Sequence, residues 1–483
     1  MAKASKPMRK HKKDIVLKKV LKKIIPTPAE ARKLKGLADK VLDVVNKEAA
    51  KHNAYAIIAG SLTRNTWLPG KEEFDIFILF PTNTPKDQME KFGLNIGKRT
   101  IKKLGGKYVI EYAEHPYVSG VVNGMHMDIV PCYEIDSTEH LKSSVDRTPF
   151  HVRYIEKHLA PELSNEVRLL KQFCKAQGIY GADAKTEGFS GYVCELLVIK
   201  YGSFLAVLEA ASGWRAGYII DIEGFYRKEQ YAELRKRFKE QPLILIDPTD
   251  AKRNTAAAVS PRSFQILRSA ARRFLESPSE YMFFPRKKKP LTLRELKALQ
   301  KKRETELIVI KFKPPAVVPD ILWPQLRRFA QRLESILKEN EFIVLRKAVY
   351  TNEKDLAVVL LEMETSKLPA VRKRIGPSIF DESGSKNFIK KYKTRAINGP
   401  FVENCFRVVE LKRKFRTAKQ KLADSLGDSL KILKAKGIPS HIAEQIAKKY
   451  MLVTDVKKIA ALAKKDKQFG IFLREYFEKE KIV

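Results

Sequence analysis

The chain has 483 residues, of which 44% are hydrophobic, and this length predicts three or four domains with sizeable cores rather than one. Lysine and arginine number 94 against 56 aspartate and glutamate, and the formal net charge of +38 indicates a polyanionic partner such as nucleic acid, or else a thermophile-like surface. No apolar run approaches the length of a membrane span. The four cysteines are widely spaced and include no CxxC pair, which argues against a zinc site or a disulfide framework. This cysteine usage favours a reducing, cytoplasmic compartment.

The N-terminal stretch is basic throughout and reads MAKASKPMRKHKKDIVLKKVLKKIIP. Pairs of lysines interrupt its apolar residues, so it lacks the continuous apolar core of a secretion signal. Residues 14–25 are predicted to form a basic amphipathic helix, which either contacts RNA or is simply solvated.

Helix and strand patterns alternate over the next part of the chain. Apolar residues recur at helical spacing in PAEARKLKGLADKVLDVVNKEAAKH, and the strand-like AYAIIAG follows directly. DIFILF continues as a strand, and further strands follow, with Asn123 and Gly124 predicting a type I′ hairpin turn. Residues 1–155 are therefore predicted to form a head domain, a mixed sheet with flanking helices.

The pattern of predicted helices and strands changes twice over the rest of the chain. Residues 156–275 are predicted to form a helical central domain, since NEVRLLKQFCKAQ and SGYVCELLVIKYGSFLAVLEAAS both read as helices and the second is apolar almost all round. Residues 276–415 mix strand and helix patterns, and the lysine-rich residues 416–483 predict two or three short helices. The fold class is α+β, multidomain.

Three acids stand out because each lies in or beside an apolar strand. Glu73 and Asp75 are two residues apart and point to the same face of a strand, where like charges repel unless a proton or a cation lies between them. Asp128 lies mid-strand in GMHMDIVP, where an unpaired acid is costly. Three such carboxylates suit two magnesium ions about 3.5–4 Å apart, although pairing with nearby lysine or arginine is an equally simple explanation.

A phosphate-binding turn precedes these acids. Gly60 and Ser61 follow an apolar strand, so the backbone and a hydroxyl can approach a phosphate closely, and Arg64 adds a planar charged donor. The turn, the short spacer and the strand acids together predict metal-assisted transfer of a phosphoryl-type group.

Several segments, taken in order, resemble the archaeal-type (class I) CCA-adding enzymes of the polymerase-beta-like nucleotidyltransferase superfamily: GSLTRNTWLPG, FDIFILFP, YAEHPYVSGVV, MDIVPCY, SVDRTPFH, NEVRLLKQF, GIYGAD, GFSGYVCELL and IDPTDAKRN. The resemblance is strong over residues 28–275 and weaker to about residue 415. It implies a polymerase-beta-like head, a helical neck and an α+β region that binds RNA.

The resemblance also implies a role for each matching residue. Glu73, Asp75 and Asp128 are the implied catalytic metal ligands, and Arg253 is implied to read the base edge of ATP or CTP. The other implied nucleotide contacts are Gly60, Ser61, Arg64, His151, Lys171 and Tyr180. Outside the family context, Tyr180 reads equally as a packed aromatic, His151 as a surface residue and Lys171 as one lysine among many.

Two features depart from the family pattern. Phe74 stands between the metal-binding acids, where a smaller aliphatic residue is commoner, and its bulk is expected to change the packing behind the site. The lysine-rich chain after about residue 415 matches the family poorly, which leaves its contacts open.

The implied activity is the addition or repair of the 3′-terminal CCA of tRNA from CTP and ATP, with magnesium and without a template. The implied partner is the acceptor arm and 3′ end of tRNA. No membrane association is implied. Homodimers are common in the family. A poly(A) or oligoadenylate polymerase shares every catalytic acid and is the alternative. A catalytically dead RNA-binding protein is disfavoured by the intact acids, and small-molecule nucleotidylation leaves most of the basic chain unexplained.

Overall fold

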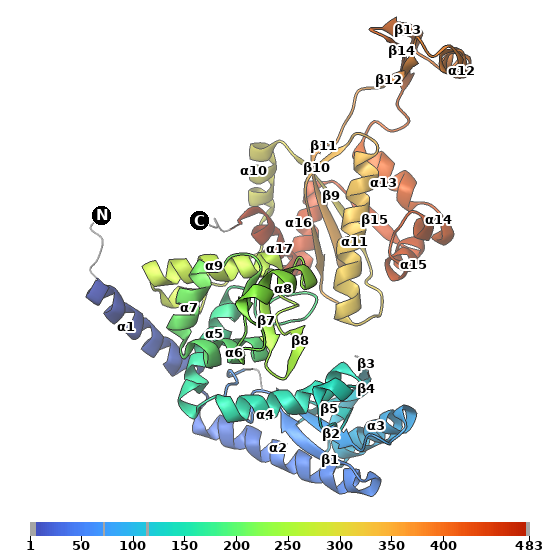
Figure 1. The fold of residues 1–483 in the computed structure, drawn as a ribbon. Helices are drawn as coiled ribbons and strands as arrows, with labels where there is room; N and C mark the ends of the chain where they lie inside the picture. The colour runs from blue at the N-terminus through green and yellow to red at the C-terminus, as the bar shows by residue number, and fades with distance from the viewer. Residues whose placement is uncertain (1–5, 71–72, 113–114, 480–483) are drawn as a thin grey trace. The chain divides into compact units, whose positions relative to one another are not determined.

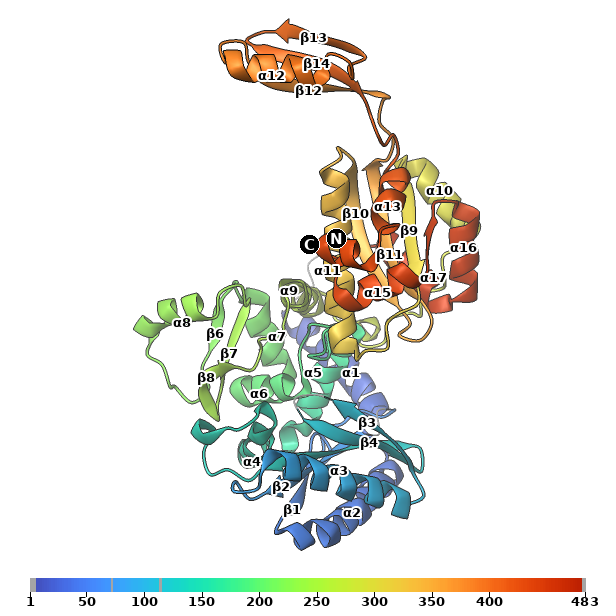
Figure 2. The same cartoon turned by 90° about the vertical axis from the view of Figure 1, so that its right-hand side faces the viewer.

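The structure is a computed structural model that describes residues 6–70, 73–112 and 115–479. Its contacts divide the described chain into two units, residues up to 286 and residues from 287 onward. Figures 1 and 2 show the elements of each unit from two directions. Each unit has hydrophobic cores of its own.

The head of the first unit is a five-stranded sheet in the order β1-β2-β5-β4-β3, in which β2 and β5 are parallel and the other neighbours antiparallel. The turn between β4 and β5 has positive φ at both Asn123 and Gly124, so the predicted type I′ hairpin is confirmed. The elements of the head are β1 (Tyr55–Ala59), β2 (Glu73–Phe80), β3 (Lys107–Tyr112), β4 (Pro116–Val122), β5 (Met125–Tyr133), α2 (Pro28–Ala49), α3 (Lys86–Lys103) and α4 (Thr148–His158).

Helices cover both faces of this sheet. α2 and α3 pack on one face and α4 on the other (Figures 1 and 2). α2 begins at a capping box in which Thr27 and Glu30 each bond the backbone N–H of the other. Phe74 is 2% exposed and packs in the core under α2 and α3, on the opposite face from Glu73 and Asp75. Its bulk therefore fills the core behind the acids.

The neck is mainly helical, as predicted, but the sequence missed a small sheet in the order β6-β7-β8. The segment predicted as one long apolar helix is two, because Gly202 ends the first with φ +81° and the Ser203 side chain caps the second. The elements are α5 (Ser164–Ala176), α6 (Gly191–Tyr201), α7 (Phe204–Gly213), β6 (Tyr218–Ile220), α8 (Tyr231–Arg237), β7 (Leu243–Asp247), β8 (Asp250–Asn254) and α9 (Pro261–Glu276).

The predicted N-terminal helix is α1 (Lys6–Ile24). Val16, Val20 and Ile24 lie on one side of it and are buried in the neck core, where α1 packs against α5. The lysines of its other faces, including Lys18, Lys19 and Lys22, are exposed.

In the described part of the chain, no single helix is long and apolar enough to cross a membrane. α6 and α7 reach the required length and composition only as a pair bent by 94°. Both contribute buried residues to the neck core.

The second unit is built on an antiparallel sheet in the order β10-β11-β9-β15. α11, α13, α14 and α15 share one core with it, and α10, α16 and α17 share another. A smaller sheet, β12-β14-β13, packs with α12. The elements are α10 (Leu293–Arg303), β9 (Glu306–Phe312), α11 (Pro319–Lys338), β10 (Ile343–Thr351), β11 (Ala357–Thr365), β12 (Val371–Ser378), α12 (Glu382–Tyr392), β13 (Asn398–Glu403), β14 (Phe406–Lys412), α13 (Ala418–Leu426), α14 (Leu430–Ala435), α15 (Ser440–Lys448), β15 (Tyr450–Val453), α16 (Val456–Lys465) and α17 (Lys467–Phe477).

Candidate active site

The three predicted acids come together on one face of the head sheet. β2 and β5 pair in parallel with Asp75 directly opposite Asp128, and Glu73 lies two residues before Asp75 on the same face. Gly60, at the end of β1, has φ +88°, and a Cβ on it would lie 3.3 Å from an oxygen of the Asp75 carboxylate. Glycine is therefore required here both by the backbone conformation and by the close approach of the acid.

Other polar groups surround Asp128. Ser119 lies opposite it on β4 and hydrogen-bonds its carboxylate, and Glu111 on β3 accepts a hydrogen bond of 2.9 Å from the Tyr117 hydroxyl. Burial raises the pKa of Asp128, the hydrogen bond from Ser119 opposes this rise, and the neighbouring Glu111 and Glu73 add to it. Asp128 thus lies in a surplus of negative charge, which a cation would relieve.

The resemblance stated above implies a divalent metal at these acids. Within residues 6–70, 73–112 and 115–479, no three His, Cys, Asp or Glu side chains are grouped closely enough to hold an ion. The donor set nevertheless suits a hard cation, because Asp75 and Asp128 are in register on adjacent parallel strands, Glu73 shares their face, and carboxylate oxygens are the ligands that such cations prefer. By donor type and placement these residues fit the group.

The predicted phosphate-binding residues Arg64 and Lys171 meet at Glu195, a residue of α6 that has no exposed surface. An Arg64 guanidinium nitrogen lies 3.0 Å from one Glu195 oxygen, and Lys171 Nζ lies 2.9 Å from the other. The Thr66 hydroxyl donates to the same oxygen as Lys171, at 2.6 Å. Burial opposes ionisation of Glu195, but Lys171 and Arg64 outweigh it and hold its pKa below the usual value.

The neck also holds the backbone of the turn after Gly60. Ser164 Oγ donates to the Arg64 carbonyl at 3.3 Å, while Arg168 donates to the Trp67 carbonyl at 3.1 Å and to Asn65 Oδ1 at 2.6 Å. Burial lowers the pKa of Arg168 to about 10, so it is still charged at neutral pH. The conformation of the turn thus depends on the neck as well as on the head.

The Tyr180 hydroxyl lies beside Gly191 of α6, close to the Lys171 ammonium. Burial raises the pKa of its phenol. A Cβ on Gly191 would lie 3.3 Å from that hydroxyl. The absence of a side chain at Gly191 therefore leaves room for the Tyr180 hydroxyl.

His151 and Arg253 belong to a second cluster, around the buried Asp247 of β7. His151 Nε2 lies 2.8 Å and an Arg253 nitrogen 2.7 Å from the same Asp247 oxygen, and the Tyr192 ring stacks on the imidazole at 4.1 Å. The Thr249 hydroxyl donates to the other oxygen at 2.8 Å. Burial opposes ionisation of Asp247, yet the bonds from His151, Thr249 and Arg253 hold its pKa well below the usual value.

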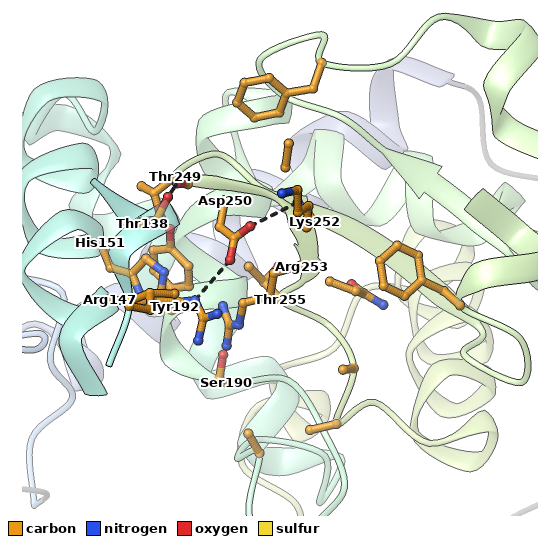
Figure 3. A pocket seen from close by; sticks show the side chains of 18 of the residues that line it. Thr138, Arg147, His151, Ser190, Tyr192, Thr249, Asp250, Lys252, Arg253 and Thr255 are labelled. Carbon is orange, nitrogen blue, oxygen red and sulfur yellow. Dashed lines mark hydrogen bonds and ion pairs between the residues drawn. The ribbon is translucent and has the colours of Figure 1, made fainter. Parts of the chain in front are cut away.

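This second cluster lines a cavity of about 1020 Å³. Figure 3 shows Arg147 and Asp250 pointing toward each other on its wall, and their ion pair measures 3.1 Å. The walls are rich in charged and polar groups, including Arg147, His151, Lys252 and Arg253. Such walls suit a ligand with phosphates and hydrogen-bonding edges.

The structure therefore sorts the predicted residues into three groups. Glu73, Asp75 and Asp128 share the sheet face beside Gly60; Arg64 and Lys171 meet at Glu195; His151 and Arg253 meet at Asp247. Ser61 lies in the turn between the first two groups, and its carbonyl accepts a 2.9 Å bond from the Thr66 N–H.

Glu195 and Asp247 were not among the site residues predicted from the sequence. Each is an acid in an otherwise apolar stretch, CELLV and LILID, which is the signal that singled out Asp128. Applied to the whole chain, that signal finds both residues.

Three known families match the chain in order. "Nucleotidyltransferase domain" matches residues 38–151, "tRNA nucleotidyltransferase, second domain" matches 165–284, and "CCA-adding enzyme, C-terminal domain" matches 303–455. Together they cover the head, the neck and most of the second unit.

Curated relatives match over most of their length. A CCA-adding enzyme of Methanoregula boonei is 37% identical over 428 residues, covering 89% of each chain. One of Methanosarcina acetivorans is 35% identical over 461 residues, covering 95% of this chain and 97% of that protein. Among solved structures, the Cid1 poly(U) polymerase with MgGTP bound matches 58% of this chain at 14% identity, with a TM-score of 0.44.

Proposed function

This chain belongs to the archaeal-type CCA-adding enzyme family, and from that premise we propose that it adds or repairs the 3′-terminal CCA of tRNA, using CTP and ATP without a nucleic-acid template. The family and the nucleotidyltransferase class predicted from the sequence are confirmed by relatives that match nearly from end to end. The poly(A) alternative is not favoured, because the matching relatives are CCA-adding enzymes.

One observation supports the catalytic assignment above the others. Asp75 and Asp128 lie directly opposite each other on parallel strands, Glu73 shares their face, and the absence of a side chain at Gly60 lets the backbone approach the Asp75 carboxylate closely. This is a site where the RNA 3′-hydroxyl can attack the α-phosphorus of a nucleotide in line as pyrophosphate leaves.

The three carboxylates are the proposed ligands of magnesium. When bound, such ions neutralise the phosphate charge and stabilise the attacking and leaving oxygens. The Tyr117–Glu111 pair and Ser119 fix the surroundings of Asp128, and Phe74 packs behind the strand, so the acid face is held from both sides.

The other two groups take the proposed substrate roles. The turn at Gly60 and Ser61, with Arg64 and Lys171 beneath it, meets the triphosphate. His151 and Arg253 on the cavity wall meet the sugar and the base, and Arg253 can donate to acceptors on either cytosine or adenine. Tyr180 packs beside the sugar or base.

The proposed partner is the acceptor arm and 3′ end of tRNA, bound mainly through phosphates and shape by the basic neck and second unit. tRNA as substrate makes the cytoplasm the expected place of action. A homodimer is an expectation taken from the family, and the molar mass of the protein in solution, measured by light scattering, would test it.

The function is tested by incubating the protein and magnesium with labelled CTP and ATP, separately and together, and with tRNA transcripts lacking the last three, two or one nucleotides. We expect CTP alone to add two residues to the shortest transcript, and ATP then to add one and stop. Unlimited extension of any RNA by ATP alone would instead identify a polyadenylating enzyme.

A further inference from the structure

Glu195 connects the head to the neck through charge. It lies on α6 with no exposed surface, and it meets Arg64 and Thr66 from the head turn and Lys171 from α5. Lys171 is only 1% exposed, and its Nζ also donates to the Thr66 hydroxyl at 2.9 Å. Two cations and a hydroxyl thus converge on one carboxylate.

The charges of this cluster do not cancel. One carboxylate faces two cations, so the cluster keeps a net positive charge, and its Thr66 is tied to the turn by the bond from its N–H to the Ser61 carbonyl. Without the carboxylate, Arg64 and Lys171 would repel each other in a buried space, and at least one would have to move out. Glu195 is what allows both cations to stay.

We propose that Glu195 is a positioning residue for the nucleotide triphosphate: it holds Arg64, Thr66 and Lys171 so that the turn keeps its shape and its positive charge. It acts only through these residues, because a buried carboxylate can neither reach nor attract a phosphate. The proposal rests on the proposed function, which supplies the triphosphate substrate.

The bonds around the turn explain why one carboxylate matters. The neck fixes the backbone on either side of Thr66, through Ser164 to the Arg64 carbonyl and through Arg168 to the Trp67 carbonyl. The Thr66 hydroxyl donates to Glu195 and accepts from Lys171, which itself pairs with Glu195. Loss of the Glu195 charge therefore disturbs both partners of this hydroxyl and leaves the bonds to the Arg64 and Trp67 carbonyls in place.

The test compares Glu195→Gln with Glu166→Gln in the full-length protein. Gln keeps the shape of Glu195 but removes the charge that balances Arg64 and Lys171. Glu166 is a neck carboxylate on α5 that accepts a 2.8 Å bond from the Phe204 N–H, which an amide oxygen can also accept. Calorimetry measures binding of inorganic tripolyphosphate with magnesium, and filter binding measures tRNA affinity.

We expect Glu195→Gln to weaken tripolyphosphate binding about tenfold or more and to raise KM for CTP and ATP equally, because a charge-assisted interaction is lost. The affinity for tRNA should stay near wild type and Glu166→Gln should match wild type throughout, while the melting temperature of Glu195→Gln should fall, because two buried cations lose the charge that balances them. Unchanged tripolyphosphate affinity, or a loss of tRNA affinity as large as the loss of tripolyphosphate affinity at a temperature where the variant is folded, would overturn the proposal.

A milder variant keeps the test decisive if Glu195→Gln does not fold. Thr66→Val is close in volume, keeps every charge and removes the hydroxyl that donates to Glu195 and accepts from Lys171, so we expect roughly threefold to tenfold weaker tripolyphosphate binding. Wild-type affinity in this variant contradicts the proposal. Tripolyphosphate binding is measured without tRNA or nucleotide transfer, so failure of wild-type protein to add CTP and ATP would overturn the proposed function separately.

Discussion

Three carboxylates in the first unit meet their partners in different ways. Asp128 faces other acids, Glu195 balances two cations from different domains, and Asp247 holds an imidazole and a guanidinium. An acid among acids keeps a charge that a metal can neutralise, whereas an acid among cations is already neutralised and serves to hold them. The surroundings of each acid therefore support the proposed division into a catalytic role for Asp128 and positioning roles for Glu195 and Asp247.

Asp128→Asn tests the catalytic role. It keeps the size of the side chain and removes one negative charge, so nucleotide incorporation should fall at least about a thousandfold, since metal ions contribute several kcal/mol to such steps. The affinity for tRNA should stay within about twofold. Asp136→Asn, at an exposed carboxylate of the head, is the control and should keep full activity. Equal loss of tRNA binding and incorporation in Asp128→Asn would refute the assignment.

Asp247→Asn tests the anchoring of His151 and Arg253 through its pH dependence. The folded-state pKa of Asp247 lies below the usual value of about 3.9, so its ionised form stabilises the fold fully above that pH and loses this effect as pH falls below it. The free energy of unfolding from urea titrations should drop by about 1–3 kcal/mol in the variant at neutral pH. This difference should be constant down to about pH 5 and shrink below pH 4; a difference that grows in acid would contradict the anchor.

The residue types of the site could be predicted from the sequence, but their pairings could not. Asp128 stood out because an acid in an apolar strand is costly alone. Glu195 and Thr66 are 129 residues apart, and only the packing of α6 against the head turn makes them neighbours. The grouping of Arg64 with Lys171, and of His151 with Arg253, depends on such tertiary contacts.

At the scale of helices and strands, the residues of a turn predicted local structure most reliably. Asn123 and Gly124 predicted their hairpin because a type I′ turn needs positive φ at both positions. The break at Gly202 was missed because apolar residues continue on both sides of it. The sheet in the neck was missed because its strands, such as Tyr218–Ile220, are too short to give an alternating pattern.

Glycines in two helices should respond oppositely to alanine. A Cβ on Gly97 of α3 would lie 2.8 Å from Val118 of β4, whereas one on Gly36 of α2 meets nothing within 4 Å. Gly97→Ala should lower the free energy of unfolding, because overpacking by about 1–3 kcal/mol exceeds the helix gain of about 1 kcal/mol. Gly36→Ala should instead stabilise by about 0.5–1 kcal/mol. Urea unfolding measures both, and stabilisation by Gly97→Ala would show that α3 does not depend on close approach to the sheet.

At the scale of the whole molecule, charge is the dominant property. The formal charge of +38 is spread over both units, and α1 alone exposes Lys12, Lys18, Lys19 and Lys22 while burying its apolar side in the neck. Composition predicted a polyanionic partner, which agrees with the family, but it could not show which basic surfaces meet RNA. That assignment depends on where each lysine lies.

The affinity for tRNA should therefore fall steeply with salt. If about six phosphates are contacted, log K against log salt should have a slope near −4 to −5, because each contact releases condensed counterions. Filter binding between roughly 50 and 300 mM KCl measures the slope. The double substitution Lys18→Glu and Lys22→Glu in α1 should make the slope of log K against log salt shallower if that helix contacts the RNA. A flat salt response of the wild-type protein would mean that its basic surface faces only solvent.

The division into two units also affects how the chain folds during synthesis. Every core of the first unit closes within residues 1–286, so the catalytic unit can be complete while the rest is still being translated. In the second unit, β9 (Glu306–Phe312) must wait for β15 (Tyr450–Val453) to pair along its free edge. At about 5–20 residues per second, the ribosome needs roughly 10–40 s for the second unit, and during that time the edge of β9 is exposed to wrong partners. Nascent-chain aggregation should therefore arise mainly in the second unit, after the first unit is already folded.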